Sequence, residues 1–208
     1  MRAATRLFAE RGVETVSLRE ITRAAGQRNS SALQYHFTDR QTLLRDILSE
    51  HALDTGTRRH ALLDHQELRG LTSLRELASA LVLPLVAKLE APEEGRSYLQ
   101  ICAELLGRTN RTIGPADPVS LVVKDPAGSL ARWGRLVAAS IPAEALGPPL
   151  HRRFAAIHFA HQELGRRARD DSHDHTLFSS CLIDLVAAVL AAPVTEETRR
   201  IMDERRSP

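Results

Sequence analysis

Aromatic side chains are scarce in this sequence, at 4% of its 208 residues. Strands favour aromatic and β-branched side chains, so this scarcity beside abundant Ala and Leu favours helices over a sheet. A large charge of one sign is also missing, because the formal net charge is only +2 at pH 7. No run approaches the roughly 20 apolar residues that would span a bilayer, and no secretion signal is present. We therefore expect a cytoplasmic protein with no membrane partner.

Motifs of enzymes are missing as well. The sequence has no Gly-rich phosphate loop, no nucleophile elbow and no convincing pair of catalytic carboxylates. We therefore expect no enzymatic activity and no cofactor. Only two cysteines occur, Cys102 and Cys181, each in an apolar run. They are expected to be small hydrophobic side chains rather than a disulfide, because free cysteine is commonly buried.

Histidine offers the one alternative of a metal site. His158-x-x-His161 places two imidazoles on one helix face, and His173-Asp-His175 adds two more. A zinc site needs three or four converging ligands, and neither His-Glu-x-x-His nor CxxC occurs. We therefore favour polar or interface histidines over metal ligands.

Three capping patterns mark the starts of helices. Ser17-Leu-Arg-Glu20, Thr38-Asp-Arg-Gln41 and Ser73-Leu-Arg-Glu76 each place a hydroxyl three residues before a Glu or Gln, the pattern of a capping box. Apolar periodicity then predicts further helices, and the tail after Pro193 is charged. The helices expected after a polar stretch at 54–70 span residues 73–90, 93–110, 126–140, about 150–170 and 175–192.

The first fifty residues carry a distinctive order of segments: Leu7-Phe8-Ala9-Glu10-Arg11-Gly12, Ser17-Leu18-Arg19-Glu20-Ile21, Ala24-Ala25-Gly26, Tyr35-His36-Phe37 and Leu43-Leu44. In order and spacing this stretch resembles the N-terminal domain of the TetR family. The resemblance implies an all-α chain with a three-helix helix-turn-helix DNA-binding domain at residues 1–52. A larger C-terminal helical domain at 53–208 would bind an effector and form a dimer.

The resemblance places the DNA-reading surface on the short helix after Gly26. Asn and Gln can pair with adenine, Arg with guanine, and matched positions near the next helix touch phosphate. Ten arginines against seven acidic residues in 1–60 suit this role. The DNA-binding candidates are Arg28, Asn29, Ser30, Ser31, Gln34, Tyr35, His36, Thr38 and Arg40.

Apolar stripes in the larger domain provide candidates for a ligand pocket and for a dimer interface. Ligand pockets are mostly apolar with a few polar groups. The pocket candidates are Leu81, Leu85, Tyr98, Ile101, Cys102, Leu105, Trp133, Phe154 and His158. The dimer candidates, on the last two long helices, are Phe154, Ile157, His161, Leu164, Phe178, Leu182, Leu185 and Val189. Burial in the core of one chain is the alternative for each of them.

The expected function is that of a homodimeric transcriptional regulator. It would be a repressor that a small, largely apolar molecule releases from a near-palindromic double-stranded operator. Activation stays open. A second alternative is a helical adaptor that has lost DNA binding. That alternative is raised by Gln34, where many family members have Tyr, and by one extra residue between Gly26 and His36.

Overall fold

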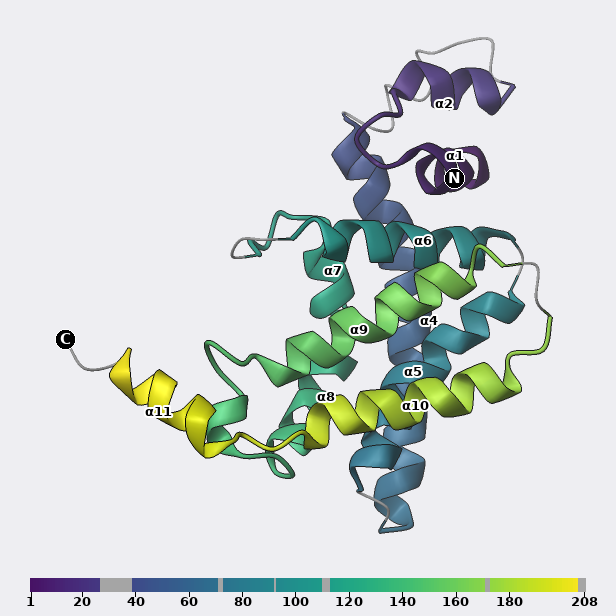
Figure 1. Ribbon diagram of the computed structural model, residues 1–208. Coiled ribbons are helices and arrows are strands. Elements are labelled where there is room, and N and C mark those ends of the chain that lie inside the picture. Colours follow the sequence, from purple (N-terminus) through teal and green to yellow (C-terminus); the bar gives the residue numbers. More distant parts are fainter. Residues whose placement is uncertain (27–38, 71–72, 92, 110–112, 171–172, 206–208) are drawn as a thin grey trace.

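A computed structural model describes residues 1–26, 39–70, 73–91, 93–109, 113–170 and 173–205. Every regular element in these ranges is a helix, which confirms the all-α fold (Figure 1). The helices in chain order are α1 (Arg2–Arg11), α2 (Leu18–Ala24), α4 (Arg40–Leu68), α5 (Leu74–Glu90), α6 (Glu93–Gly107), α7 (Ser120–Val123), α8 (Ser129–Ala138), the 3-10 helix η1 (Ala143–Ala145), α9 (Arg152–Arg167), α10 (Thr176–Ala191) and α11 (Glu196–Glu204).

Two of the predicted capping boxes are confirmed atom by atom. At α2 the Ser17 Oγ accepts from the Glu20 backbone N–H at 3.3 Å, and the Ser17 N–H donates to Glu20 Oε2 at 2.9 Å. Ser73 and Glu76 repeat both bonds at α5 with the same distances. Each box satisfies two backbone donors that a helix start leaves without partners.

The start of α4 differs from the prediction. Its N-cap is Asp39, whose carboxylate accepts from the Thr42 N–H at 2.7 Å. The N-cap expected from the sequence, Thr38, lies outside the described residues. A carboxylate caps a helix as well as a hydroxyl does and also favours the positive end of the helix dipole.

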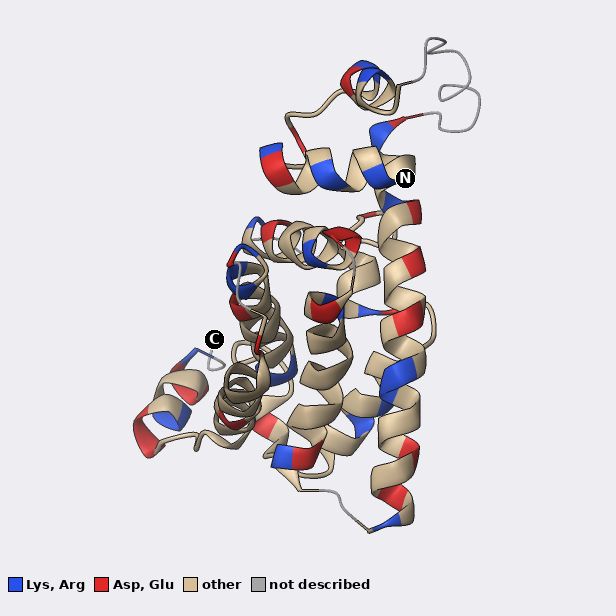
Figure 2. Cartoon of the chain, turned by 90° about the vertical axis from the view of Figure 1, so that its right-hand side faces the viewer, with Lys and Arg blue, Asp and Glu red and all other residues tan. Residues whose placement is uncertain are grey.

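The polar stretch expected at 54–70 is helical and forms the second half of α4. The helix continues because its inward side chains are buried: Leu63 is fully covered, and Arg59 and Gln66 are buried with hydrogen-bonding partners. The division into residues 1–52 and 53–208 thus falls inside one continuous helix. Figure 2 shows α4 as the long helix along one edge of the molecule, with basic and acidic residues interspersed along it.

The charged tail also forms a helix, which the sequence pattern did not predict. Thr195 caps α11 by accepting from the Thr198 N–H at 3.2 Å, and Met202 on this helix is buried. No single helix among the described residues is both long and apolar enough to cross a membrane. The bent pair α10 and α11 meets those criteria only when taken together.

The helices form a small head and a larger body. α1 and α2 lie at one end of α4, and α6 crosses α4 directly beneath α1 (Figure 1). In the body, α9 packs on α6, and α10 packs on α5 and α9. The head therefore rests on α6, which also forms part of the body core.

The α6–α9 contact depends on a glycine. A Cβ at Gly165 would collide with the Ala103 Cβ and lie 3.2 Å from the Leu99 carbonyl oxygen. We expect Gly165→Ala to lower the free energy of unfolding by about 1–3 kcal/mol, as overpacking does. The matched control is Gly107→Ala, whose Cβ would meet only Gln162 Nε2 at 3.4 Å. Urea unfolding should place this control within about 1 kcal/mol of wild type; equal stability of both variants would contradict the close packing.

Candidate functional site

The head is built on a small apolar core. Phe8 of α1, Ile21 of α2 and Leu43 of α4 are all buried. Leu18 is partly buried against them. These contacts fix α1, α2 and the first turns of α4 as one unit.

Most of the predicted DNA-binding residues lie outside the described part of the chain: Arg28, Asn29, Ser30, Ser31, Gln34, Tyr35, His36 and Thr38. Arg40 is described and lies in the first turn of α4. Its Nη2 is 2.9 Å from Glu14 Oε2, and its Nη1 donates to the Glu14 carbonyl oxygen. Arg40 therefore joins α4 to the connection between α1 and α2.

A carboxylate of the body fixes the head in place. Glu104 of α6 accepts from the Val13 backbone N–H through both oxygens, at 3.2 and 3.3 Å. Arg108 lies 3.1 Å from the same carboxylate. On the other side, Arg45 of α4 donates to the Ala116 carbonyl oxygen at 2.9 Å. The head is thus held on α6 and on the segment before α7.

A groove of about 170 Å³ lies between the head and the body. On the head side it is lined by residues that include Val13, Arg40 and Leu44. On the body side it is lined by Leu105, Thr109, Ile113 and others. This groove is too small for a drug-sized ligand, but it marks where movements of the body would reach the first turns of α4.

A much larger cavity of about 990 Å³ lies in the body. Its size is typical of a site for a small molecule. Its described lining mixes aromatic and aliphatic side chains with a few polar ones: Thr109, Ile113, Val123, Lys124, Asp125, Gly128, Leu130, Ala131, Trp133, Gly134, Leu146, His151, Arg153, Phe154 and Ile157. Lys124 and His151 are exposed, so the cavity opens to solvent beside them.

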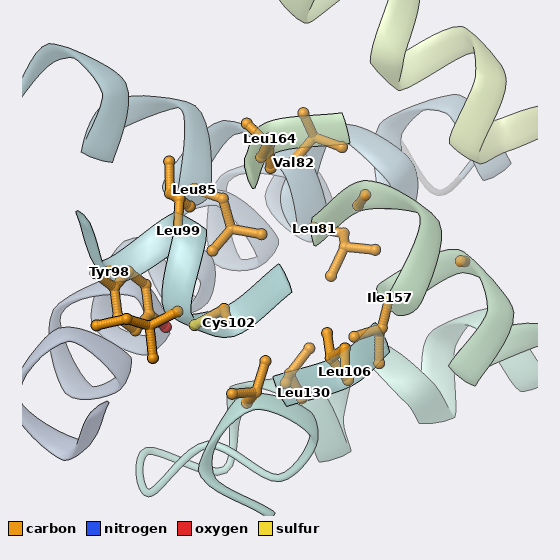
Figure 3. Packing of buried hydrophobic residues seen from close by; sticks show 14 of the residues in the cluster. Leu81, Val82, Leu85, Tyr98, Leu99, Cys102, Leu106, Leu130, Ile157 and Leu164 are labelled. Carbon is orange, nitrogen blue, oxygen red and sulfur yellow. The ribbon is translucent and has the colours of Figure 1, made fainter. Parts of the chain in front are cut away.

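The structure brings two of the nine predicted pocket residues to this cavity, Trp133 and Phe154. Leu105 lines the smaller groove instead, and His158 is half-buried beside Phe154, with ring centroids 6.2 Å apart. The remaining five lie in the body core, where Ile101 is fully buried. Figure 3 shows the other four: Leu81, Leu85, Tyr98 and Cys102.

Burial gives two of these core residues strongly perturbed pKa values. It raises the pKa of the Cys102 thiol to about 12 and raises the pKa of Tyr98 well above its usual value. Both therefore stay neutral near pH 7. The Tyr98 ring stacks on His51 at a centroid distance of 4.6 Å. These contacts describe a packed core rather than a ligand surface.

Sequence reasoning missed the charged part of the cavity lining. Lys124, Asp125 and His151 lie in connections between helices, where apolar periodicity gives no signal. Arg153 is on α9 but lies outside the apolar stripe. The one available signal was the Gly and Pro content of these connections, which often carry function.

Asp125 is paired within the protein. Its carboxylate accepts from the Ser129 N–H at 3.0 Å, the Ser129 Oγ–H at 2.9 Å and the Leu130 N–H at 2.7 Å. The buried Arg59 places its Nη1 3.5 Å from Asp125 Oδ2 and 2.7 Å from Ser129 Oγ. Burial lowers the pKa of Arg59, and the carboxylate of Asp125 opposes that shift.

The predicted dimer residues fall into two groups. Ile157, His161, Leu164 and Leu182 are buried within the single chain. Phe154, Phe178, Leu185 and Val189 keep accessible surface, and Leu185 is 51% exposed. The Arg167 guanidinium lies 5.2 Å from the centroid of the Phe178 ring.

An exposed stripe on α10 shares Leu185 with that prediction. Leu177, at 76% exposure, and the exposed Cys181 lie two turns and one turn before Leu185 on the same side of the helix. We call Leu177, Cys181 and Leu185 the α10 stripe. Cys181 was expected to be buried, and its exposure corrects that expectation.

Burial makes His161 a source of pH-dependent stability. It lowers the pKa of His161 to about 4, although the ring Nδ1 donates to the Ile157 carbonyl oxygen at 2.8 Å. The unfolded chain takes up this proton near pH 6.5 and the folded chain only near pH 4. The free energy of unfolding should therefore fall as pH decreases across that window, by up to about 3 kcal/mol.

Urea unfolding between pH 7 and pH 4 tests this. His161→Gln should remove most of the decrease, whereas a Gln at the exposed His65 should leave it in place. An unchanged pH dependence in His161→Gln would assign the effect to another group.

Within the described ranges, no three or more His, Cys, Asp or Glu side chains are arranged to hold a metal ion.

Comparison with known proteins agrees with this architecture. Residues 1–47 match the family model described as "Bacterial regulatory proteins, tetR family". No curated protein matches the chain. Among solved structures the chain is similar to AmtR of Mycobacterium smegmatis, with a TM-score of 0.56 and 19% identity over 99% of this chain and 91% of that chain. Residues 1–47 are therefore similar to the N-terminal domain of the TetR family, and the chain shares the fold of AmtR.

Proposed function

We propose that this chain is a TetR-like DNA-binding transcriptional regulator, a homodimeric repressor that a small molecule releases from a near-palindromic operator. The observation that carries the proposal is the body cavity of about 990 Å³, which shares two lining residues, Thr109 and Ile113, with the groove under the head. A ligand in the cavity would contact the same two residues that line the groove. Residues 1–52 would bind DNA, and residues 53–208 would bind the ligand and the second subunit.

Coupling would run from the cavity to α4. Thr109 and Ile113 line the groove together with Arg40 and Leu44, in the first turns of α4. A ligand that binds one arrangement of head and body better than another would shift the head relative to the body. Couplings of this kind typically change affinity about 5–150-fold. In a dimer, that shift changes the distance between the two heads and weakens operator binding.

Dimerisation would use the α10 stripe together with the predicted dimer residues that keep accessible surface. A single head covers only a few base pairs, which is too little for genomic specificity. Two heads related by a two-fold axis would read two half-sites, and this is the reason for a near-palindromic operator.

Fluorescence anisotropy with DNA from upstream of its own gene tests the regulator. We expect tight and selective binding that weakens between two salt concentrations, with random DNA as the control. Weak and equal binding to both DNAs would contradict the proposed regulation of its own gene. It would favour the alternative of a helical adaptor that has lost DNA binding.

Arg40→Ala tests the one described candidate for a phosphate contact. If Arg40 binds phosphate, the variant should weaken binding to all DNA sequences. The slope of the logarithm of the binding constant against the logarithm of the salt concentration should then fall in magnitude by about one. The matched control is Glu14→Ala, which breaks the same ion pair but keeps the Arg40 guanidinium. Equal losses in both variants would assign Arg40 to holding the head together.

Gln34→Ala should instead relax preference at one base position.

A further inference from the structure

The cavity of the body is lined by apolar surface and by positive charge. Trp133, Leu146 and Phe154 supply broad apolar walls. Lys124 and Arg153 are the two permanent cations among its described lining residues, and Asp125 is the one acid. Whether the cavity favours an anionic or a cationic ligand therefore depends on which of these three groups already has a partner of opposite charge within the protein.

Asp125 is not available to a ligand. Three donors from the first residues of α8 occupy its two oxygens, and the buried Arg59 lies within ion-pair distance. A cationic ligand would thus meet a carboxylate whose charge is already cancelled, and it would also meet two cations.

Arg153 is available. It is half-buried near the start of α9, and its Nη1 donates to the Gly134 carbonyl oxygen at 3.2 Å. No acidic side chain within the described ranges lies within ion-pair distance of it. Arg132 on α8 is different, because both Asp64 and Glu67 pair with its guanidinium. A charge that is half-removed from water, with no counter-ion among the described residues, favours an anionic ligand.

The position of Arg153 is defined by close packing on a glycine. A Cβ at Gly134 would lie 3.1 Å from Arg153 Nη1. The side chain therefore lies flat on the α8 backbone at the edge of the cavity. The first turn of α9 adds a favourable field, because backbone N–H groups at a helix start have no partners within the helix and the His151 side chain makes no capping bond.

We propose that the cavity takes an amphipathic organic anion, a single carboxylate on an apolar body, and that Arg153 selects it. The carboxylate pairs with the Arg153 guanidinium, and the apolar body lies against Trp133, Leu146 and Phe154. This inference rests on the proposed function, since it names the class of effector for the same cavity. It narrows the largely apolar effector expected from the sequence to one that carries an acid group.

Two probes of matched length test the inference, octanoate and octanamide. Trp133 is the only tryptophan in the chain and lines the cavity, so its fluorescence reports occupancy directly. We expect octanoate to bind at least about tenfold more tightly than octanamide, because charge-assisted hydrogen bonds to arginine are the stronger ones. Arg153→Gln should reduce octanoate binding to the octanamide level, and Arg153→Lys should retain part of the preference.

The control variant is Arg135→Gln, at an exposed arginine of α8 that does not line the cavity. It should keep the full preference for octanoate. Equal binding of the two probes, binding of neither probe, or an unchanged preference in Arg153→Gln would each overturn the inference. The regulator itself is judged separately by anisotropy: selective DNA binding by the wild type would stand even if octanoate failed. Absence of selective DNA binding by the wild-type protein would contradict the proposed function, whether or not octanoate and octanamide bind.

Discussion

Asp125→Asn is expected to lower the free energy of unfolding by about 3–5 kcal/mol, because it leaves the buried Arg59 without its counter-charge. Arg59 is 2% exposed and Asp125 is 6% exposed, so water cannot replace the lost partner. The Arg59 Nε already lacks a hydrogen-bonding partner. The amide also cannot accept from all three donors of Ser129 and Leu130, which weakens the start of α8. Urea unfolding at pH 7 measures the loss.

Two controls separate the unpaired charge from a general loss of packing. In Arg59→Met/Asp125→Asn no buried charge remains, so part of the stability should return, although the amide still caps α8 poorly. Asp64→Asn breaks the exposed ion pair with Arg132, where Asp64 is 62% exposed, and should cost less than about 1 kcal/mol. A double variant less stable than Asp125→Asn alone would show that the charge is not the cause.

This ion pair also illustrates what the sequence could not predict. Arg59 lies in the polar stretch at 54–70, which gave no helical signal of its own, and Asp125 lies in a connection before α8. Neither position shows apolar periodicity, and the contact joins residues far apart along the chain. Only the packing of α4 against α8 and against the connection before it brings them together.

The sequence predicted those features that depend only on residues close together along the chain. The Ser17 and Ser73 capping boxes involve atoms three residues apart, so the sequence alone predicts both helix starts. Composition favoured helices, and the resemblance of the first fifty residues to the TetR-family N-terminal domain implied the all-α fold and a separate head. The N-cap of α4 is Asp39, one residue after the predicted Thr38, because an Asp carboxylate can also accept a hydrogen bond from a backbone N–H of the first turn.

Periodicity gave the apolar face of each helix but not the depth of a residue within the body. Leu81, Tyr98 and Cys102 lie on apolar faces as expected, yet they pack into the core and leave Trp133 and Phe154 at the cavity. A stripe on one helix has the same pattern whether its cover is another helix, a ligand or a second subunit. The three possibilities separate only when the helices are placed together.

The same ambiguity applies to α10, and one experiment resolves it. Leu182 packs within the chain, whereas Leu177 and Leu185 are 76% and 51% exposed. Two exposed leucines with Cys181 between them form an apolar surface that a second copy of α10 could cover. We expect Leu177→Glu/Leu185→Glu to convert the proposed dimer to monomers and to weaken operator binding by about 10²–10⁴-fold, the usual gain from two linked binding modules.

The matched control is Leu68→Glu, at an 88% exposed leucine that ends α4, far along the chain from α10. It should change neither the molecular mass in light scattering nor the anisotropy titration. In the α10 variant, retained far-ultraviolet circular dichroism would show that the monomer still folds. A variant that stays dimeric would assign the subunit contact to another face of the body. A monomer that still binds the operator with wild-type affinity would contradict the need for two heads.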